Sequence, residues 1–192
     1  MKYRAFILVL LFVWITQAIP QNVERYKAYH DKGREEILQG HYEEGIRWLD
    51  TANRIMPYYP AIYQDKGYAE MQLKRYEDAV ADFSYVLDKK PYMYEVRLQR
   101  GIAYYHLDLF DQAKSDLEEV INTSPKKIPE AGRYLEYTLR ALEEINKAEQ
   151  RLIDQQQYEL EKERLRAARQ RESMIWSTVV PLALWTTLFI WW

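Results

Sequence analysis

The chain has 192 residues, of which 48% are hydrophobic, 15% aromatic and 29% charged, and its formal net charge is -2. A mean hydropathy of -0.53 excludes a polytopic membrane protein, and the aromatic and aliphatic content excludes a wholly disordered chain. The near-neutral charge gives no reason to expect a nucleic-acid partner, and the lack of cysteine excludes disulfides, thiolate metal sites and cysteine nucleophiles.

Residues 1–18 have the composition of an export signal. Lys2 and Arg4 precede an unbroken apolar run over residues 5–15, which is too short to cross about 30 Å of hydrocarbon as a helix. The small residues Thr16 and Ala18 then resemble the flanks of a secretory cleavage site. A short uncleaved anchor is the alternative, and both interpretations place the following residues on the exported side.

Residues 26–127 repeat three times with a period of 34 residues. Glycines, prolines, small residues and aromatic residues each recur in the same register. The sets are Gly33, Gly67 and Gly101; Pro57, Pro91 and Pro125; Gly45, Ala79 and Ala113; and Tyr42, Tyr76 and Phe110. We expect two antiparallel helices per unit, because the glycine permits close packing of the first helix and the proline ends the second. Stacking of the units would then supply the core.

This pattern resembles the tetratricopeptide repeat, with units at residues 26–59, 60–93 and 94–127. The resemblance implies an all-α solenoid of antiparallel helix pairs that forms a right-handed superhelix. The first helices depart from the family pattern. Cations stand at the family's leucine position, Arg97 replaces an aromatic residue, and two glutamates replace the tyrosine that only Tyr104 retains. The cations are Lys32, Lys66 and Arg100, and the glutamates are Glu36 and Glu70.

Residues 128–153 are expected to form a capping helix. Apolar residues recur there at helical spacing: Leu135, Leu139, Leu142, Ile145, Leu152 and Ile153. Residues 154–173 lose this stripe and suggest a charged helical stalk or a flexible linker. A coiled coil is a further alternative, but the heptad pattern fails at the glutamines 155–157.

Residues 174–192 are nineteen residues without a charge and are expected to form a transmembrane tail. A helix of that length would span roughly 28 Å, about one bilayer core. An apolar helix docked on the soluble domain is the alternative. Cations between Lys162 and Arg171 would favour a cytoplasmic flank, but the N-terminal signal favours export. We give the first segment precedence, so the repeats are expected on the exported side, periplasmic or extracytoplasmic in a bacterium.

No catalytic or metal-binding motif is present in the sequence. His30, His41 and His106 fall at unrelated repeat positions, and there is no phosphate-binding glycine loop or nucleophile elbow. The sequence therefore predicts no enzymatic activity, no metal, no cofactor and no small-molecule substrate.

In tetratricopeptide arrays the first helices line a concave groove that binds peptides or partner helices, and the resemblance implies the same use here. The groove positions would be Lys27, His30, Arg34, Leu38, Gln64, Tyr68, Met71, Leu98, Ile102 and Tyr105. Met71 and Ile102 could instead pack against adjacent helices. Chaperone adaptors of the family grip a C-terminal carboxylate at positions that here include Asp65 and Glu95, which would repel it. We therefore expect no chaperone-adaptor role.

The leading functional prediction is a non-enzymatic, membrane-anchored scaffold that binds a protein partner through the groove and helps to assemble a membrane complex. The alternative is a structural subunit of a membrane complex, held chiefly by its Trp-rich tail over residues 174–192. In that case the repeats would act as a spacer.

Overall fold

The computed structural model describes residues 22–124, 128–179, 181–183 and 185. All elements within these ranges are helices joined by turns, so the predicted all-α class is confirmed. The expected export signal over residues 1–18 and the repeat residue Pro125 lie outside the described residues. Two compact units divide the chain, one up to Ala141 and one from Leu142 onward.

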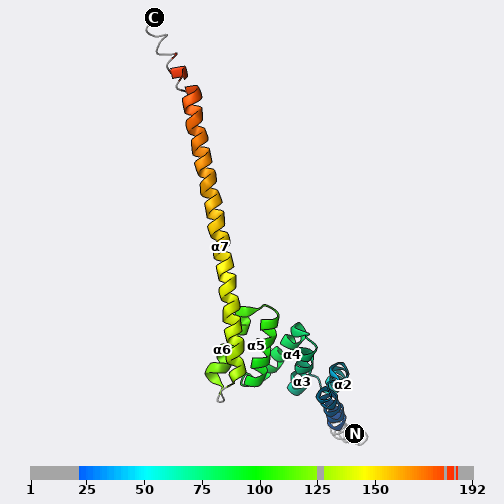
Figure 1. The fold of residues 1–192 in the computed structure, drawn as a ribbon. Coiled ribbons are helices and arrows are strands. Elements are labelled where there is room, and N and C mark those ends of the chain that lie inside the picture. The colour runs from blue at the N-terminus through cyan, green and yellow to red at the C-terminus, as the bar shows by residue number, and fades with distance from the viewer. Residues whose placement is uncertain (1–21, 125–127, 180, 184, 186–192) are drawn as a thin grey trace, which may run out of the picture. The chain divides into compact units, whose positions relative to one another are not determined.

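The first unit is a run of short helices that pack in pairs (Figure 1). Residues 22–38 are helical. The following helices are α2 (Tyr42–Ile55), α3 (Pro60–Gln72), α4 (Tyr76–Lys89), α5 (Tyr94–His106), α6 (Phe110–Thr123) and the start of α7 (Pro129–Met174). From α2 to α6, helices that follow one another in the chain pack together, and α3 also contacts α5. The first helices of successive repeats therefore lie next to each other, as the solenoid prediction requires.

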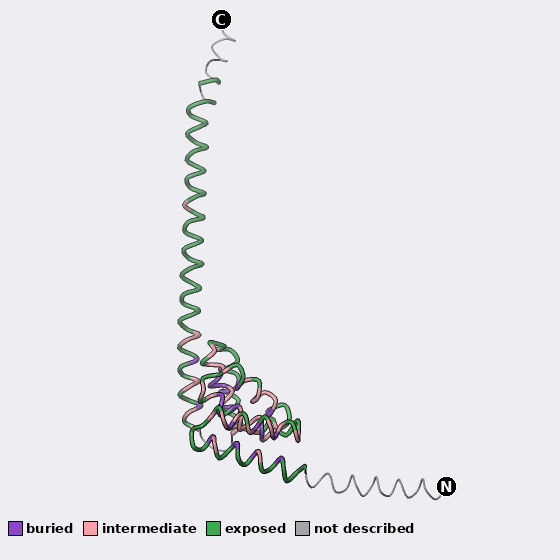
Figure 2. The backbone as a smooth tube through the Cα atoms, turned by 90° about the vertical axis from the view of Figure 1, so that its right-hand side faces the viewer, coloured by how far each residue is buried: buried purple, intermediate pink, exposed green. Residues whose placement is uncertain are grey.

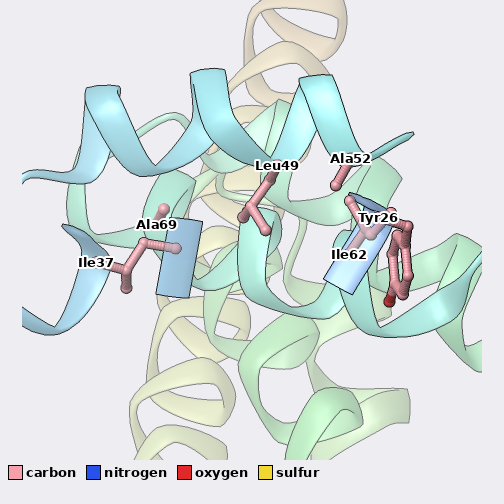
Figure 3. Packing of buried hydrophobic residues seen from close by; sticks show 6 residues of the cluster. All are labelled: Tyr26, Ile37, Leu49, Ala52, Ile62 and Ala69. Atoms are coloured by element: carbon pink, nitrogen blue, oxygen red, sulfur yellow. The ribbon is translucent and has the colours of Figure 1, made fainter. Parts of the chain in front are cut away.

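The recurring glycines are explained by the residues that face them. A Cβ atom added to Gly33, Gly67 or Gly101 would lie 2.8, 2.6 or 3.1 Å from the nearest side-chain atom of the second helix. Those neighbours are the buried Leu49, Phe83 and Leu117, which occupy one repeat position. Glycine thus lets the two helices of each pair approach closely. Figure 3 shows Leu49 within the core cluster of the first repeats.

The turn inside each pair also follows the repeat. Gly40, Lys74 and Asp108 stand 34 residues apart, and their φ angles are 84°, 60° and 58°. This left-handed conformation suits glycine and is strained for lysine. The shared left-handed conformation could not be predicted from glycine spacing, because only the first repeat has glycine at this position.

The cations at the family's leucine position make polar contacts instead of apolar ones. The Nζ atom of Lys32 lies 3.9 Å from the ring centre of Trp48, and that of Lys66 lies 2.8 Å from Asp50 and 3.9 Å from Asp82. Trp48, Asp82 and Asp116 occupy one repeat position, and Asp116 contacts Arg100. Each cation therefore joins the first helix of its repeat to the second helix of that repeat.

The second unit consists mainly of the later part of α7. Residues 154–173, predicted as a stalk or a linker, are helical and almost all exposed, as Figure 2 shows in green. A π-helix, Ile175–Val179, follows Met174. Within the described ranges, no helix combines the length and the apolar character that a membrane crossing needs. The predicted tail over residues 174–192 includes residues 180, 184 and 186–192, which lie outside those ranges, so it stays a prediction.

Candidate protein-interaction surface

The predicted groove residues come from three neighbouring helices: residues 22–38, α3 and α5. The structure divides them by burial. Lys27, Arg34, Leu38 and Tyr68 are exposed, and the exposed fraction of Leu38 reaches 85%. Gln64, Met71 and Tyr105 are half-buried, whereas His30, Leu98 and Ile102 are buried. We call the accessible set, Lys27, Arg34, Leu38, Gln64 and Tyr68, the first-helix face.

Three of the predicted groove residues pack in or against the hydrophobic core. Leu98 and Ile102 are only 5% and 4% exposed and pack in one cluster with Leu117. Met71 lies against the same cluster. These contacts match the alternative in which such residues pack between adjacent helices, so we leave them out of the first-helix face.

At the N-terminal end of the first-helix face, the carboxylate of Asp65 contacts His30 and Arg34. Asp65 Oδ2 of α3 lies 2.9 Å from His30 Nε2 and 3.5 Å from Arg34 Nε. The ring of His30 stacks on that of Tyr26, at 5.6 Å between ring centres. Asp65 thus offsets the positive charge that the sequence alone placed at this end, while the side chain of Arg34 stays more than half exposed.

In the third repeat, the predicted groove residue Tyr105 lies within an aromatic cluster. Its ring contacts those of His106, Phe110, Tyr134 and Tyr137, at centre-to-centre distances of 5.5, 5.9, 5.6 and 6.3 Å. Burial and the nearby charge of Lys74 lower the pKa of His106, so its ring is mostly neutral at pH 7. Tyr134 and Tyr137 were not predicted as part of this cluster, because the capping helix was expected from its aliphatic residues alone.

A separate acidic cluster lies between α2, α3 and α4. Asp50, Glu70 and Asp82 surround Lys66, and Glu70 is buried. Burial, and then the negative charge of Asp82, raise the pKa of Glu70 to about 8. Burial also raises the pKa of Asp82 to about 6. Among the described residues no group of three or more His, Asp or Glu side chains is placed to hold a metal ion.

The comparisons with known proteins agree with the repeat and its fold. Residues 94–127 match the sequence model of the tetratricopeptide repeat. The first TPR domain of Spaghetti (RPAP3), solved with the HSP90 peptide SRMEEVD, is 25% identical and has a TM-score of 0.58, with 62% of this chain and 94% of that chain covered. No curated protein sequence matches this chain.

Two further solved structures share the fold. The Sgt2 TPR domain from Aspergillus fumigatus is 21% identical with a TM-score of 0.57, covering 64% of this chain and 82% of its own. MamA from Desulfovibrio magneticus RS-1, from residue 41 to its end, is 24% identical with a TM-score of 0.58, covering 64% and 69%. The fold is therefore that of an α-solenoid of the tetratricopeptide type. Residues 94–127 are the part in which the sequence itself matches the tetratricopeptide repeat family.

Proposed function

We propose that this chain is a non-enzymatic scaffold that binds a partner peptide or helix on the first-helix face. The carrying observation is that Leu38 and Tyr68 stay 85% and 45% exposed, whereas Ile37 and Ile62 of the same two helices are buried. Tyrosine and arginine, here Tyr68 and Arg34, are enriched among the residues that carry most of the binding energy at protein interfaces. The RPAP3 domain of the same fold was solved with a bound peptide, which supports a peptide-binding use of the fold.

The charges on this face favour a particular kind of partner. Lys27 and Arg34 would attract acidic side chains of the partner, and Leu38 and Tyr68 would contact apolar ones. A free C-terminal carboxylate is disfavoured, because Asp65 already lies against His30 and Arg34. We therefore propose an internal segment with acidic and apolar residues rather than a chain terminus.

Affinity purification of the full-length chain from its host membranes, followed by mass spectrometry, would identify the partner. The double substitution Arg34→Glu with Tyr68→Ala should abolish recovery of that partner. Arg47→Glu with Tyr92→Ala is the matched control, since Arg47 also makes one ion pair and both residues are exposed and lie outside the first helices. Equal recovery with both variants would refute the assignment of the face.

We also propose that residues 174–192 anchor the scaffold in a membrane, with the repeats on the exported side. The uncharged tail and the signal-like residues 1–18 support this proposal. Protease added to intact cells, or to cells without an outer membrane, should digest the repeats. Protection by the cytoplasmic membrane alone would contradict the sidedness.

The proposal of a tail-held structural subunit is tested by replacing residues 174–192 with an unrelated membrane span. A scaffold that works through the first-helix face should keep its partner after the exchange. Loss of the partner after the exchange, with the double variant of the face still binding, would instead favour the structural subunit.

A further inference from the structure

A short arginine-rich segment stands directly before the uncharged tail. Residues 164–171, which we call the arginine segment, hold four cations and no acid, and Glu172 follows them. All four arginines are exposed: Arg164, Arg166, Arg169 and Arg171. Within the described part of the chain none of them forms an ion pair, whereas Lys147 and Lys162 of the same helix pair with glutamates. Four positive charges are therefore available to groups outside the described helix.

The arginines lie on two opposite sides of α7. When each residue advances the helix by about 100°, Arg164 and Arg171 differ by about 20°, and Arg166 and Arg169 lie about 60° apart on the other side. A helix that lies flat on a membrane has its polar charges on one face and its apolar residues on the other. Cations on both sides instead suit a helix whose ligands surround it, as they do where a helix passes end-on through a layer of headgroups.

The distance between the arginine segment and the tail matches the polar layer of a bilayer. Since α7 is continuous to Met174, at about 1.5 Å per residue Arg171 lies about 5 Å and Arg164 about 15 Å from Met174 along the helix axis. Headgroups cover about 5–8 Å on each side of the hydrocarbon core, and charges act over roughly 8 Å more at physiological salt. With the membrane core beginning at Met174, all four arginines are within reach of headgroup charges.

The residues after the arginine segment suit the edge of a bilayer. Ser173 Oγ donates to the carbonyl of Gln170 at 2.8 Å, and Thr178 Oγ1 donates to that of Met174 at 2.5 Å. These hydroxyl groups thus have acceptors within their own helix, as polar groups need where water is scarce. Trp176 is 72% exposed, and tryptophan is enriched at the boundary between membrane and water.

We infer that the arginine segment binds the phosphates of anionic phospholipids around the point where the tail enters the membrane. This inference rests on the proposed membrane anchor and names the class of lipid that the anchor prefers. Arginine pairs with phosphate through two parallel N–H···O bonds, and several cations beside a membrane span favour an anionic lipid surface. The attraction depends on the lipid in the contacted leaflet rather than on the side of the membrane, so the arginines are compatible with export.

Reconstitution of the full-length chain into vesicles of uncharged phosphatidylcholine tests the anchor by itself. The chain should float with these vesicles after alkaline extraction, because insertion of an apolar tail does not depend on lipid charge. Absence of flotation would refute the anchor and the inference together.

The lipid preference is then measured by fluorescence quenching in the same vesicles. The chain has no cysteine, so Ala168→Cys gives one site for an uncharged fluorescent label within the arginine segment. Nitroxide-labelled phosphatidylglycerol or phosphatidylcholine replaces an equal, small fraction of the lipid. Phosphatidylglycerol should quench at least about threefold more strongly than phosphatidylcholine. Salt near 1 M, which screens charges within about 3 Å, should bring this ratio close to one.

Substitution of the four arginines by glutamine should also bring the ratio close to one, whereas substitution by lysine should keep a preference because it keeps the charge. The matched control replaces four cations from the earlier part of α7 by glutamine and should keep the full preference: Arg133, Arg140, Lys147 and Arg151. An equal loss in this control would overturn the inference, since the effect would then follow the total charge of the chain.

Flotation after alkaline extraction, together with equal quenching by the two lipids, would overturn the inference and leave the anchor standing. This includes the case in which the glutamine variant instead loses the protein partner, which would assign the arginines to a protein contact.

Discussion

Arg100 donates two hydrogen bonds to Asp116, with Nε 2.7 Å from Oδ2 and Nη2 2.8 Å from Oδ1. A third bond runs from its Nη1 to the Ser84 hydroxyl at 3.1 Å. Arg97 also approaches Asp116, at 3.5 Å, and donates to the carbonyl of Pro91 at 2.9 Å. Asp116 is 4% exposed, so two guanidinium groups share one buried carboxylate. A charged cluster therefore connects α5 to α6 where the family pattern has leucine and an aromatic residue.

The first prediction concerns this cluster. Asp116→Asn should lower the free energy of unfolding by about 3–5 kcal/mol, because it leaves Arg100 without its buried counter-charge. Arg97 would keep only its ion pair with the exposed Glu119, at 3.0 Å. Urea unfolding followed by far-UV circular dichroism would measure the change. Glu118→Gln is the control, since Glu118 pairs with Lys114 at 4.0 Å on the surface, and should cost less than about 0.5 kcal/mol. Similar losses for both variants would contradict a special role for the buried pair.

The second prediction is a pH dependence that arises from Glu70. Its pKa is about 8 in the folded chain against the ordinary 4.5, so between these values the folded state holds a proton that the unfolded state has lost. This group therefore stabilises the fold at low pH, and that contribution disappears as the pH rises through about 8. We expect a fall of roughly 2–4 kcal/mol in the free energy of unfolding between pH 5 and pH 9.

Glu70→Gln places a neutral amide at this position at every pH and should remove most of this slope, whereas Glu118→Gln, at the half-buried partner of Lys114, should keep it. Asp82, with a pKa of about 6, adds a smaller fall in the free energy of unfolding, and this fall is complete at a lower pH. Parallel pH profiles for wild type and Glu70→Gln would show that Glu70 is ionised in the folded chain.

The third prediction uses the glycines. Gly67→Ala should destabilise the chain by about 1–3 kcal/mol, because the added Cβ would lie 2.6 Å from the Phe83 ring, which is 1% exposed and cannot move freely. Gly132→Ala should have the opposite sign, with a gain of about 0.5 kcal/mol, since no atom lies within 4 Å of its added Cβ and alanine favours a helix. Thermal unfolding of both variants would check the pair, and a stabilising Gly67→Ala would contradict the close contact.

The fourth prediction concerns peptides that end in a carboxylate. The labelled peptide SRMEEVD should not bind the wild-type chain measurably, because Asp65 faces His30 and Arg34 and repels the incoming carboxylate. Asp65→Asn should raise the affinity at least about tenfold, since it removes that charge and frees the cations. Fluorescence anisotropy would measure it, with Asp50→Asn on another face as the control. Tight binding by the wild type would overturn our partner proposal.

Periodicity was the part of the sequence that predicted most. The spacing of Gly33, Gly67 and Gly101 was enough to predict paired helices, because a missing side chain recurs only where two backbones come close. Periodicity could not separate surface from core within one helix. Tyr68 and Ile102 occupy the same repeat position, yet one is 45% exposed and the other 4%, because Ile102 packs into the cluster around Leu117.

A residue-by-residue comparison with the family could not predict which carboxylates pair with the cations of the first helices. Lys66 and Arg100 counted as departures from the leucine pattern, and Asp116 was not singled out. Their pairing emerges only when α5 lies on α6, since Arg100 and Asp116 are 16 residues apart in the chain. A search for cations and acids with a shared 34-residue period would have found Lys66 with Asp82 and Arg100 with Asp116.

The cation contacts bear on how this array can change in length during evolution. Lys66 contacts Asp50 of the preceding repeat, and Arg100 contacts Ser84, which occupies the same place one repeat later. If residues 60–93 were lost, Arg100 would therefore meet Asp50 in place of Ser84, and Asp116 would remain with it. The second and third units each bring their own carboxylate, Asp82 and Asp116, and each also receives an acceptor from the unit before it. Loss or duplication of a whole 34-residue unit thus leaves no buried cation stranded, whereas a deletion of any other length would.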